Sequence, residues 1–464
     1  MSRTLFPICF CLCALLLISG CRSLEQQLAE SESLFLSGQY HVASSPLKIT
    51  PQPTSKALLS NLYRASIHLM DANFEQFLND LTFAEAGLEE QDNETNWGNH
   101  YLGRNYDGLM VQTYRGLAYL FLGKPDYARV AFNRLELRQG EISRRNRRSI
   151  EKTQKEIIAE RNNPQNRDSL IYLDKVSEDS NNRAKIDGYQ HFLDQWGAYA
   201  DYESPIGRFL SGLFRLFYME DPNDAEKAVF QLKRAYGMTE SEVARQLYDL
   251  AEMLASGKIG KEWLENYVVV LFENGMGPVK EENRYELFIP FYDPVYVGIA
   301  LPVLVEQEAA YPHLTLSDGN QRLGQTSLLC SIDRLIASEF RKEQPWIIAK
   351  EITMAIIKTA LQITATEVAR RKSGDLAAFL VGISGSTISY YTTKADVLGW
   401  NLLPKEYQAA LIPRPHSDIL VISPPNSSIS LAEVALPPGP TLIYVKMPSA
   451  ALPALVKVIG PAVK

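Results

Sequence analysis

The first half of the chain carries a helical pattern of apolar and polar positions. From about Leu24 to Gly260, apolar residues recur at spacings of three and four, with short polar turns between the apolar runs. Alternation with a period of two is almost absent there. Because a spacing of three and four places side chains on one face of an α-helix, the pattern predicts a helical domain over residues 29–270.

Several segments of this half have helix–turn–helix spacing. In residues 59–86, Ala65 lies on a first predicted helix, and Phe74 begins a second one after a short polar turn. Residues 114–135 and 209–235 repeat the arrangement. This spacing resembles the tetratricopeptide repeat, which implies an α-solenoid of stacked helical hairpins. An irregular helical bundle is the alternative interpretation, since ordinary helix packing also selects alanine and aromatic residues at these spacings.

The repeat resemblance implies a binding surface. Repeats that stack on their neighbours form a concave face suited to holding a peptide or another protein. A groove lined by aromatic residues would favour protein binding over catalysis. The candidate partner-binding residues are Tyr63, Phe74, Tyr114 and Tyr127.

A highly charged segment follows the second repeat-like pair. Between Arg134 and Arg167, arginines and lysines are interleaved with glutamates. The pattern predicts one long polar helix, which the run Asn162–Asn166 ends. Mixed charge of this kind is typical of a solvated face and argues against a surface for nucleic acid or lipid headgroups.

The second half of the chain changes to a strand pattern. Residues 285–290 and 295–301 read as two strands joined by a turn, and further strands are predicted near the C-terminus between Pro- and Gly-rich turns. Five or more short strands favour a small β-sandwich-like domain over residues 285–464. The predicted fold class is therefore α+β. The later strands are expected at 407–412, 419–422, 429–434 and 441–447.

A helical insertion is predicted at 326–393, between the two groups of strands. Its helices are expected at 326–343, 346–371 and 375–391. The stretch from Leu376 to Thr393 has no charged residue, and its small residues are spaced for close helix contact. We expect a buried hairpin, with membrane insertion of Leu376–Tyr391 as the alternative.

The N-terminus has the pattern of a secretory signal. Residues 1–20 place one arginine before a short apolar stretch and end on two small residues before Cys21. Leu17-Ile18-Ser19-Gly20-Cys21 resembles the lipobox of bacterial lipoproteins. The resemblance implies cleavage before Cys21, lipidation of its thiol and a tether over residues 21–28. Arg22 stands where inner-membrane retention usually has aspartate, which implies an outer-membrane anchor facing the periplasm.

The predicted signal determines which cysteines remain in the mature chain. Three of the five cysteines lie within the signal and Cys21 carries lipid, so the mature chain keeps Cys330 alone. An internal disulfide and a cysteine zinc site are thereby excluded. Cys330 lies in the apolar segment 327–332, which we expect to be helical, with the thiol as a buried core group.

No catalytic constellation is found in the sequence. The six histidines are scattered, with none paired at i, i+4. The string Ser45-Pro46-Leu47-Lys48 matches the Ser-x-x-Lys of penicillin-binding enzymes, but the companion motifs are missing. A formal net charge of -7 argues against the binding of nucleic acid, whose phosphates are held mainly by lysine and arginine. We expect no metal, no cofactor and no enzymatic activity.

Taken whole, the chain resembles a poorly characterised family of bacterial lipoproteins. The resemblance is carried by the stretches 132–139, 298–304 and 395–404, and it implies location and architecture but no catalytic residues. The favoured hypothesis is a non-enzymatic scaffold that holds a protein partner in a cell-envelope assembly. Two alternatives are a peptidoglycan-acting enzyme or activator of one, and a membrane-inserting secretion component.

Overall fold

The protein has a helical N-terminal half and a C-terminal region of sheets, which confirms the mixed α and β composition. The computed structural model describes residues 23–48, 54–93, 101, 103–166, 175–176, 178–194, 196–197, 199, 203–289, 295–373, 395–427 and 429–461. The signal, Cys21 and the predicted helix at 375–391 lie outside the described residues.

The helical half is built from helix hairpins. Turns of three or four residues join α4 to α5, α6 to α7 and α10 to α11, and the helices of each pair pack on each other. The helices and short 3-10 segments are α2 (Leu24–Leu36), α3 (Tyr40–Ala43), η1 (Ser55–Ala57), α4 (Leu58–Met70), α5 (Phe74–Asn93), α6 (Asn105–Phe121), α7 (Pro125–Asn162), η2 (Pro164–Asn166), α9 (Ser180–Asp194), α10 (Pro205–Phe217), α11 (Pro222–Thr239), α12 (Glu242–Ala255), η3 (Lys261–Asn266) and α13 (Ile332–Ser373).

Two glycines explain how closely these helices pack. A Cβ on Gly116 of α6 would lie 2.5 Å from Cζ of Phe132 on α7, and one on Gly212 of α10 would lie 2.6 Å from Cγ of Leu232 on α11. Such distances are far below van der Waals contact, so any larger residue would push the paired helices apart. The glycines therefore fix the spacing inside two of the hairpins.

The described strands form three sheets. One has five strands in the order β11-β10-β1-β7-β6, one has four in the order β5-β4-β8-β9, and β2 and β3 form a separate hairpin. In the five-stranded sheet, β1 runs parallel to β10 and antiparallel to β7. The strands are β1 (Tyr267–Asn274), β2 (Val279–Ile289), β3 (Val295–Val305), β4 (Thr315–Asp318), β5 (Gln321–Gln325), β6 (Ser327–Ser331), β7 (Glu406–Pro413), β8 (Ile419–Ser423), β9 (Ala432–Ala435), β10 (Thr441–Met447) and β11 (Leu455–Ile459).

The five-stranded sheet is covered on both faces. Alternate residues of β1, such as Val268 and Val270, share a core with Leu316 and Ile422 of the four-stranded sheet. The intervening residues, such as Leu271, belong to the core of the helical half. A strand covered on both faces reads as a continuous apolar run rather than an alternating one.

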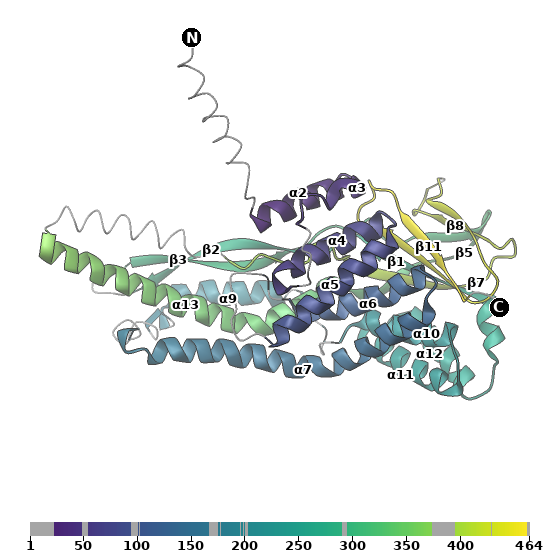
Figure 1. Ribbon diagram of the computed structural model, residues 1–464, viewed down its shortest axis with the longest axis horizontal. Helices are drawn as coiled ribbons and strands as arrows, with labels where there is room; N and C mark the ends of the chain where they lie inside the picture. The colour runs from purple at the N-terminus through teal and green to yellow at the C-terminus, as the bar shows by residue number, and fades with distance from the viewer. Residues whose placement is uncertain are drawn as a thin grey trace, which may run out of the picture.

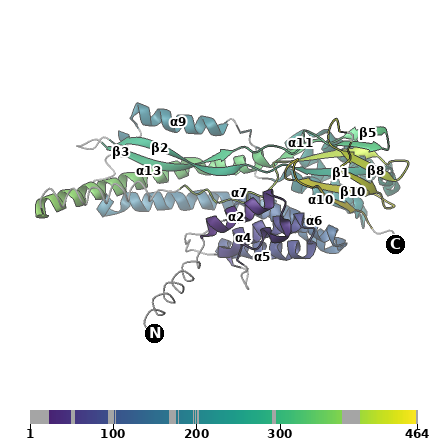
Figure 2. The same cartoon turned by 90° about the horizontal axis from the view of Figure 1, so that it is seen from above.

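An arm extends from this body. The second half of α7, α9, the β2–β3 hairpin and α13 run side by side away from the rest of the molecule in both ribbon views (Figure 1, Figure 2). The arm has its own apolar core, in which Tyr189 of α9 and Ile352 of α13 pack with Leu287 and Ile299 of the hairpin. The arm is therefore a packed unit with its own interior.

Polar contacts cover part of the edge of the hairpin. The amide side chain of Asn182 on α9 accepts a bond from the backbone N–H of Phe288, 2.8 Å, and donates one to the carbonyl oxygen of Phe288, 2.7 Å. Lys185, one turn further along α9, donates to the backbone carbonyl of Glu286. These side chains supply the hydrogen bonds that a third strand would make at this edge.

Four sequence predictions need correction. Cys330 lies on strand β6 and not on a helix, because segment 327–331 pairs with β7. The two helices expected at 326–343 and 346–371 are one helix, α13, with Pro345 inside it. Packing of this helix on the arm core outweighs the one hydrogen bond that a proline removes.

The other two corrections concern boundaries. The predicted tether 21–28 is too long, because α2 begins at Leu24. The predicted helical domain 29–270 runs too far, because β1 begins at Tyr267. Strand β1 is not predicted from the sequence, because its apolar run is continuous and lacks the alternation that marks a half-exposed strand.

Candidate functional site

The four predicted partner-binding aromatics do not form one surface. Tyr63 and Tyr114 are each 1% exposed, so neither can line a groove. Phe74 packs on the core with its ring centroid 4.9 Å from that of Phe121. Tyr127 alone is well exposed, at 61%. The prediction failed because, in a helix hairpin, the regularly spaced aromatics mostly point into the seam between the helices.

Tyr114 instead belongs to a buried cluster around Glu273. The Tyr114 hydroxyl donates to Oε1 of Glu273, 2.7 Å, and the Tyr407 hydroxyl donates to Oε2, 3.2 Å. Tyr444 and the ammonium group of Lys446 also donate to this carboxylate. The strand register places Tyr407 and Lys446 directly beside Glu273 on the neighbouring strands.

This Glu273 cluster joins the helical half to the five-stranded sheet. Glu273 is 0% exposed, and Tyr114 comes from α6 while the other members come from β1, β7 and β10. Burial, followed by the charge of Glu273, raises the pKa of Tyr114, Tyr407 and Tyr444 well above the usual value. The three hydroxyls therefore stay protonated and act as donors to the carboxylate. A closed cluster of this kind holds elements together and admits no substrate.

A second cluster lies where the arm meets the body. The guanidinium of Arg104, at the start of α6, donates to Glu343 of α13, 2.6 Å, and to Asp396, 2.8 Å. Glu339, one turn before Glu343, accepts the first two backbone N–H groups of α6, at 2.9 and 3.1 Å. On β2, Lys280 donates to the backbone carbonyl of Leu398.

The Arg104 cluster has several shifted pKa values. Burial, and then the nearby Glu343, raises the pKa of Glu339 to about 8. Burial, and then Arg104, lowers the pKa of Lys280 to about 8. Burial raises the pKa of Asp107 to about 6, although it accepts hydrogen bonds from the Tyr101 hydroxyl and the Arg104 backbone N–H. Shifted groups mark functional sites and structural ion networks alike, and every contact here joins parts of this chain.

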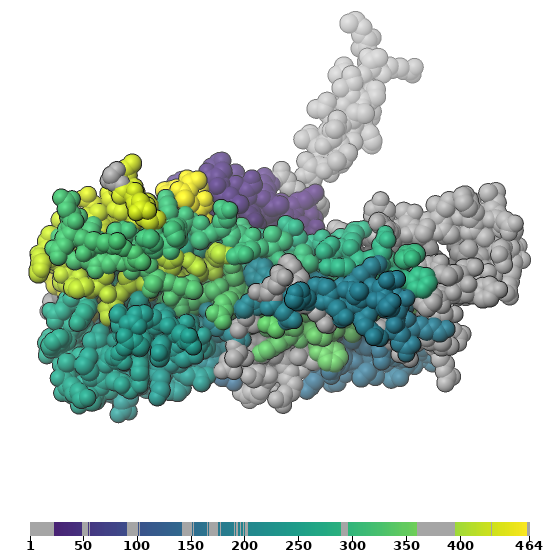
Figure 3. All heavy atoms as spheres, turned by 180° about the vertical axis from the view of Figure 1, so that it is seen from behind, coloured from purple at the N-terminus to yellow at the C-terminus, as the bar shows by residue number. Residues whose placement is uncertain are grey.

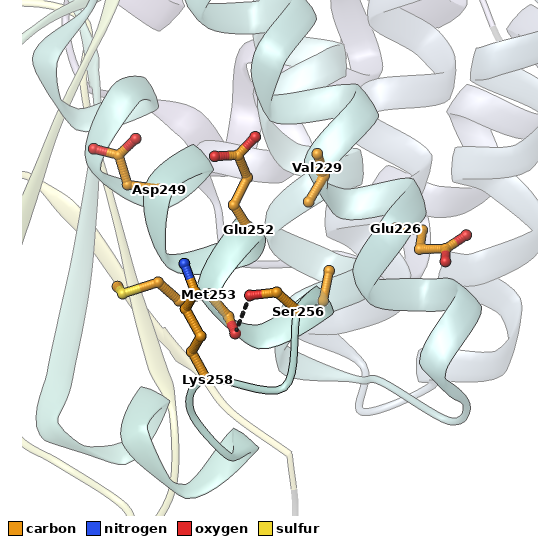
Figure 4. Close-up of a pocket in the computed structure, with 8 residues that line it drawn as sticks. Glu226, Val229, Asp249, Glu252, Met253, Ser256 and Lys258 are labelled. Atoms are coloured by element: carbon orange, nitrogen blue, oxygen red, sulfur yellow. Dashed lines mark hydrogen bonds between the residues drawn. The ribbon is translucent and has the colours of Figure 1, made fainter.

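Three open depressions lie on the described surface. The depression between α11 and α12 has a volume of 590 Å³ (Figure 4). A second, of 280 Å³, lies between α7 and α13, and a third, of 520 Å³, lies on α2. None of these three is lined by a member of the Glu273 or Arg104 clusters.

An apolar stripe follows the exposed side of α7. Tyr127, Val130 and Leu137 have exposed fractions of 61%, 51% and 71%. Their spacing of three and seven residues places them on one face of the helix, with Arg134 between them. We call these three residues the α7 stripe. Tyr127 is one of the predicted partner-binding residues, whereas Leu137 lies in the charged segment between Arg134 and Arg167, for which the sequence predicts a solvated face.

The described ranges hold neither a metal-binding cluster nor a membrane-spanning helix. They contain no group of three or more His, Cys, Asp or Glu side chains arranged to hold a metal ion. None of the helices described combines the length and the apolar character that crossing a bilayer needs. The uncharged stretch from Leu376 lies outside the described residues.

Comparisons with protein-family models, with curated proteins and with solved structures find no match for this chain. The resemblance to a bacterial lipoprotein family therefore stays a prediction from the stretches 132–139, 298–304 and 395–404. The function of the protein has to be inferred from its own residues.

Proposed function

We propose that the protein is a lipid-anchored lipoprotein on the periplasmic face of the outer membrane. In this proposal it performs no chemistry itself. It is a scaffold whose helical half holds a protein partner in a cell-envelope assembly. The helix hairpins would act as a tetratricopeptide-like stack, and the two facing sheets would act as a sandwich-like support.

The anchor is supported by the sequence and by the start of the fold. The lipobox-like Leu17-Ile18-Ser19-Gly20-Cys21 supplies the site of lipidation. The hydroxyl of Ser23 accepts the backbone N–H of Gln26 and begins α2. Because an extended chain spans roughly 3.5 Å per residue, α2 would begin within about 10 Å of Cys21, and the helical half would lie close to the bilayer.

The α7 stripe is the observation that carries the protein-binding role. Three large apolar side chains are exposed in line on one helix, and Leu137 is 71% exposed. Exposed apolar residues that gather in one place mark interaction sites more often than single scattered ones do. Burying a leucine of this kind against a partner contributes about 2 kcal/mol.

Site-specific photocrosslinking in cells tests this role. A photoreactive residue in place of Leu137 is expected to give one discrete protein adduct. The matched control is a photoreactive residue in place of Ile429, which is 76% exposed on the four-stranded-sheet side of the molecule. Equal labelling from both positions, or no adduct from either, would contradict the proposal.

Loss of the anchor gives a second check. A Cys21→Ala chain is expected to leave the membrane fraction and to lose labelling by radioactive palmitate. Retention in the membrane after washing with high salt would show that the attachment does not depend on lipid at Cys21.

A further inference from the structure

The depression between α11 and α12 combines an apolar floor with an acidic rim. Figure 3 shows this pair of helices, in teal, on an open surface at the end of the molecule opposite the arm. Val229 and Met253 are half-buried and pack on the core beneath. Glu226 of α11 and Asp249 and Glu252 of α12 surround them, with Glu252 and Val229 between the other two carboxylates in Figure 4.

The three carboxylates differ in whether they have a hydrogen-bond or ion-pair partner within the chain. Asp249 accepts a bond from Arg245, 2.8 Å, and Glu252 accepts one from the Tyr248 hydroxyl. Glu226 has no ion-pair or hydrogen-bond partner in the described part of the chain. Among the residues that line the depression, Lys258 is the one cation. The rim therefore keeps an excess of negative charge.

The end of α12 adds to this negative potential. Ser256 caps the helix at its C-terminus, where the negative end of the helix dipole lies. The last turn of α12 contains Glu252 and no basic residue. A carboxylate in this position is unfavourable for the isolated helix, and a bound cation would relieve the unfavourable interaction.

We propose that this depression binds a basic, amphipathic segment of the protein partner. Lysine or arginine side chains would lay their aliphatic stems on Val229 and Met253 and bring their charged ends to the three carboxylates. Charge complementarity and the apolar floor together select this occupant over an acidic segment, which the rim would repel. The inference rests on the proposed scaffold function and names the partner chemistry that one of its surfaces recognises.

Peptide binding to the purified, full-length protein tests the inference. The probe is a fluorescein-labelled helical peptide with leucines on one face and lysines on its flanks. A second peptide has glutamate at each lysine position. The protein variants are E226Q/E252Q, which removes two rim charges with little change in shape, and E75Q/E433Q, which removes two exposed carboxylates elsewhere.

The lysine peptide is expected to bind the natural protein and E75Q/E433Q equally, and to bind more weakly as salt increases. The loss of two exposed charge pairs predicts roughly tenfold weaker binding to E226Q/E252Q. The glutamate peptide should not bind. Unchanged melting temperatures of both variants would show that the fold is intact.

Two results would overturn the inference. One is equal affinity of the lysine peptide for the natural protein and E226Q/E252Q, and the other is no binding of the lysine peptide at all. Crosslinking from position 137 in the E226Q/E252Q variant distinguishes two cases: the depression is not the binding site, or the protein is not a scaffold at all. If the adduct persists at full yield, the scaffold function stands without the depression, and if the natural chain gives no adduct, the scaffold function itself fails.

Discussion

The Glu273 and Arg104 clusters both fasten α6 to the rest of the molecule, but they do so with different chemistry. Glu273 faces three hydroxyls and one ammonium group, all of them donors, and has no second carboxylate among these partners. Glu339 lies beside Glu343, and the two carboxylates share one end of α6 with a single arginine. The first cluster is fully compensated, whereas the second retains repulsion that depends on proton binding.

The contrast between the two clusters indicates which part of the molecule can respond to a change in pH. The three tyrosine hydroxyls that donate to Glu273 do not titrate near neutral pH, because burial and the nearby carboxylate raise their pKa values far above that range. The Arg104 cluster, where the arm meets the body, contains Asp107, Glu339 and Lys280, whose pKa values are shifted to about 6, 8 and 8. The contacts between the arm and the body should therefore depend more strongly on pH than the contacts of the Glu273 cluster.

Glu273→Ala is expected to have the largest effect. It leaves the ammonium of Lys446, whose side chain is 3% exposed, buried without its carboxylate. Removing one member of a buried ion pair lowers the free energy of unfolding by about 3–5 kcal/mol. Urea denaturation measures the loss. The double variant E273L/K446M should recover part of it, since no unpaired charge then remains, and a single variant within about 1 kcal/mol of the natural protein would contradict the account.

Arg104→Ala should have a smaller, localised effect. Glu343 would lose its cation, with a side chain that is 14% exposed, and Asp396 would lose a pair that is mostly in solvent. We expect a loss of about 2 kcal/mol. Hydrogen exchange shows where stability is lost. The backbone amides of β2 and α13 should exchange faster, while those of β1 and β10 stay protected. A uniform increase over the whole chain would show that the cluster does not act specifically on the arm.

Glu339→Gln tests the pH dependence. The pKa of Glu339 is raised from the usual 4.5 to about 8 in the folded protein, so the folded state holds this proton more tightly than the unfolded chain does. Its contribution to stability is complete below about pH 4.5 and is lost as the pH rises through about 8. Glutamine cannot ionise, so the variant should lose less stability than the natural protein between pH 5 and 8, by up to about 4 kcal/mol.

Thermal unfolding across that pH range measures the Glu339 effect. The range should end near pH 8, because Lys280 acts in the opposite direction above it. The pKa of Lys280 is lowered to about 8 from 10.5, so its contribution grows between these two values. A matched control is Glu433→Gln, an exposed carboxylate on β9. If the stability of the natural protein and that of E339Q change with pH in the same way, the contacts between the arm and the body do not depend on the protonation of Glu339.

The sequence predicted the helices well because their apolar spacing is local information. It also predicted the strands at β2, β3, β7, β8 and β10, which are bounded by turn residues. It missed β1, β4, β5, β6 and β11, and it expected β9 slightly early, at 429–434. Strands β1 and β6 lie in apolar runs that strands and helices share. Cys330 was placed on the wrong kind of element for this reason.

The candidate sites were harder to predict because they depend on contacts between distant segments. Glu273 and Lys446 are single charges within two otherwise apolar strands, and this matching pair was the one available signal. Nothing local to Tyr114 reveals that its hydroxyl reaches the sheet. Glu339 and Glu343 share a helix face, but their partner Arg104 is more than two hundred residues away in the sequence.

Co-purification shows whether the helical half holds a protein partner. The natural protein, L137R and I429R would be extracted from membranes in mild detergent and their associated proteins measured by quantitative mass spectrometry. Both substitutions add a charge at an exposed apolar site, so they should change stability by less than about 0.5 kcal/mol. We predict one protein that is enriched with the natural chain and with I429R and is at least about tenfold depleted with L137R. An identical set of proteins with all three chains would contradict the claim.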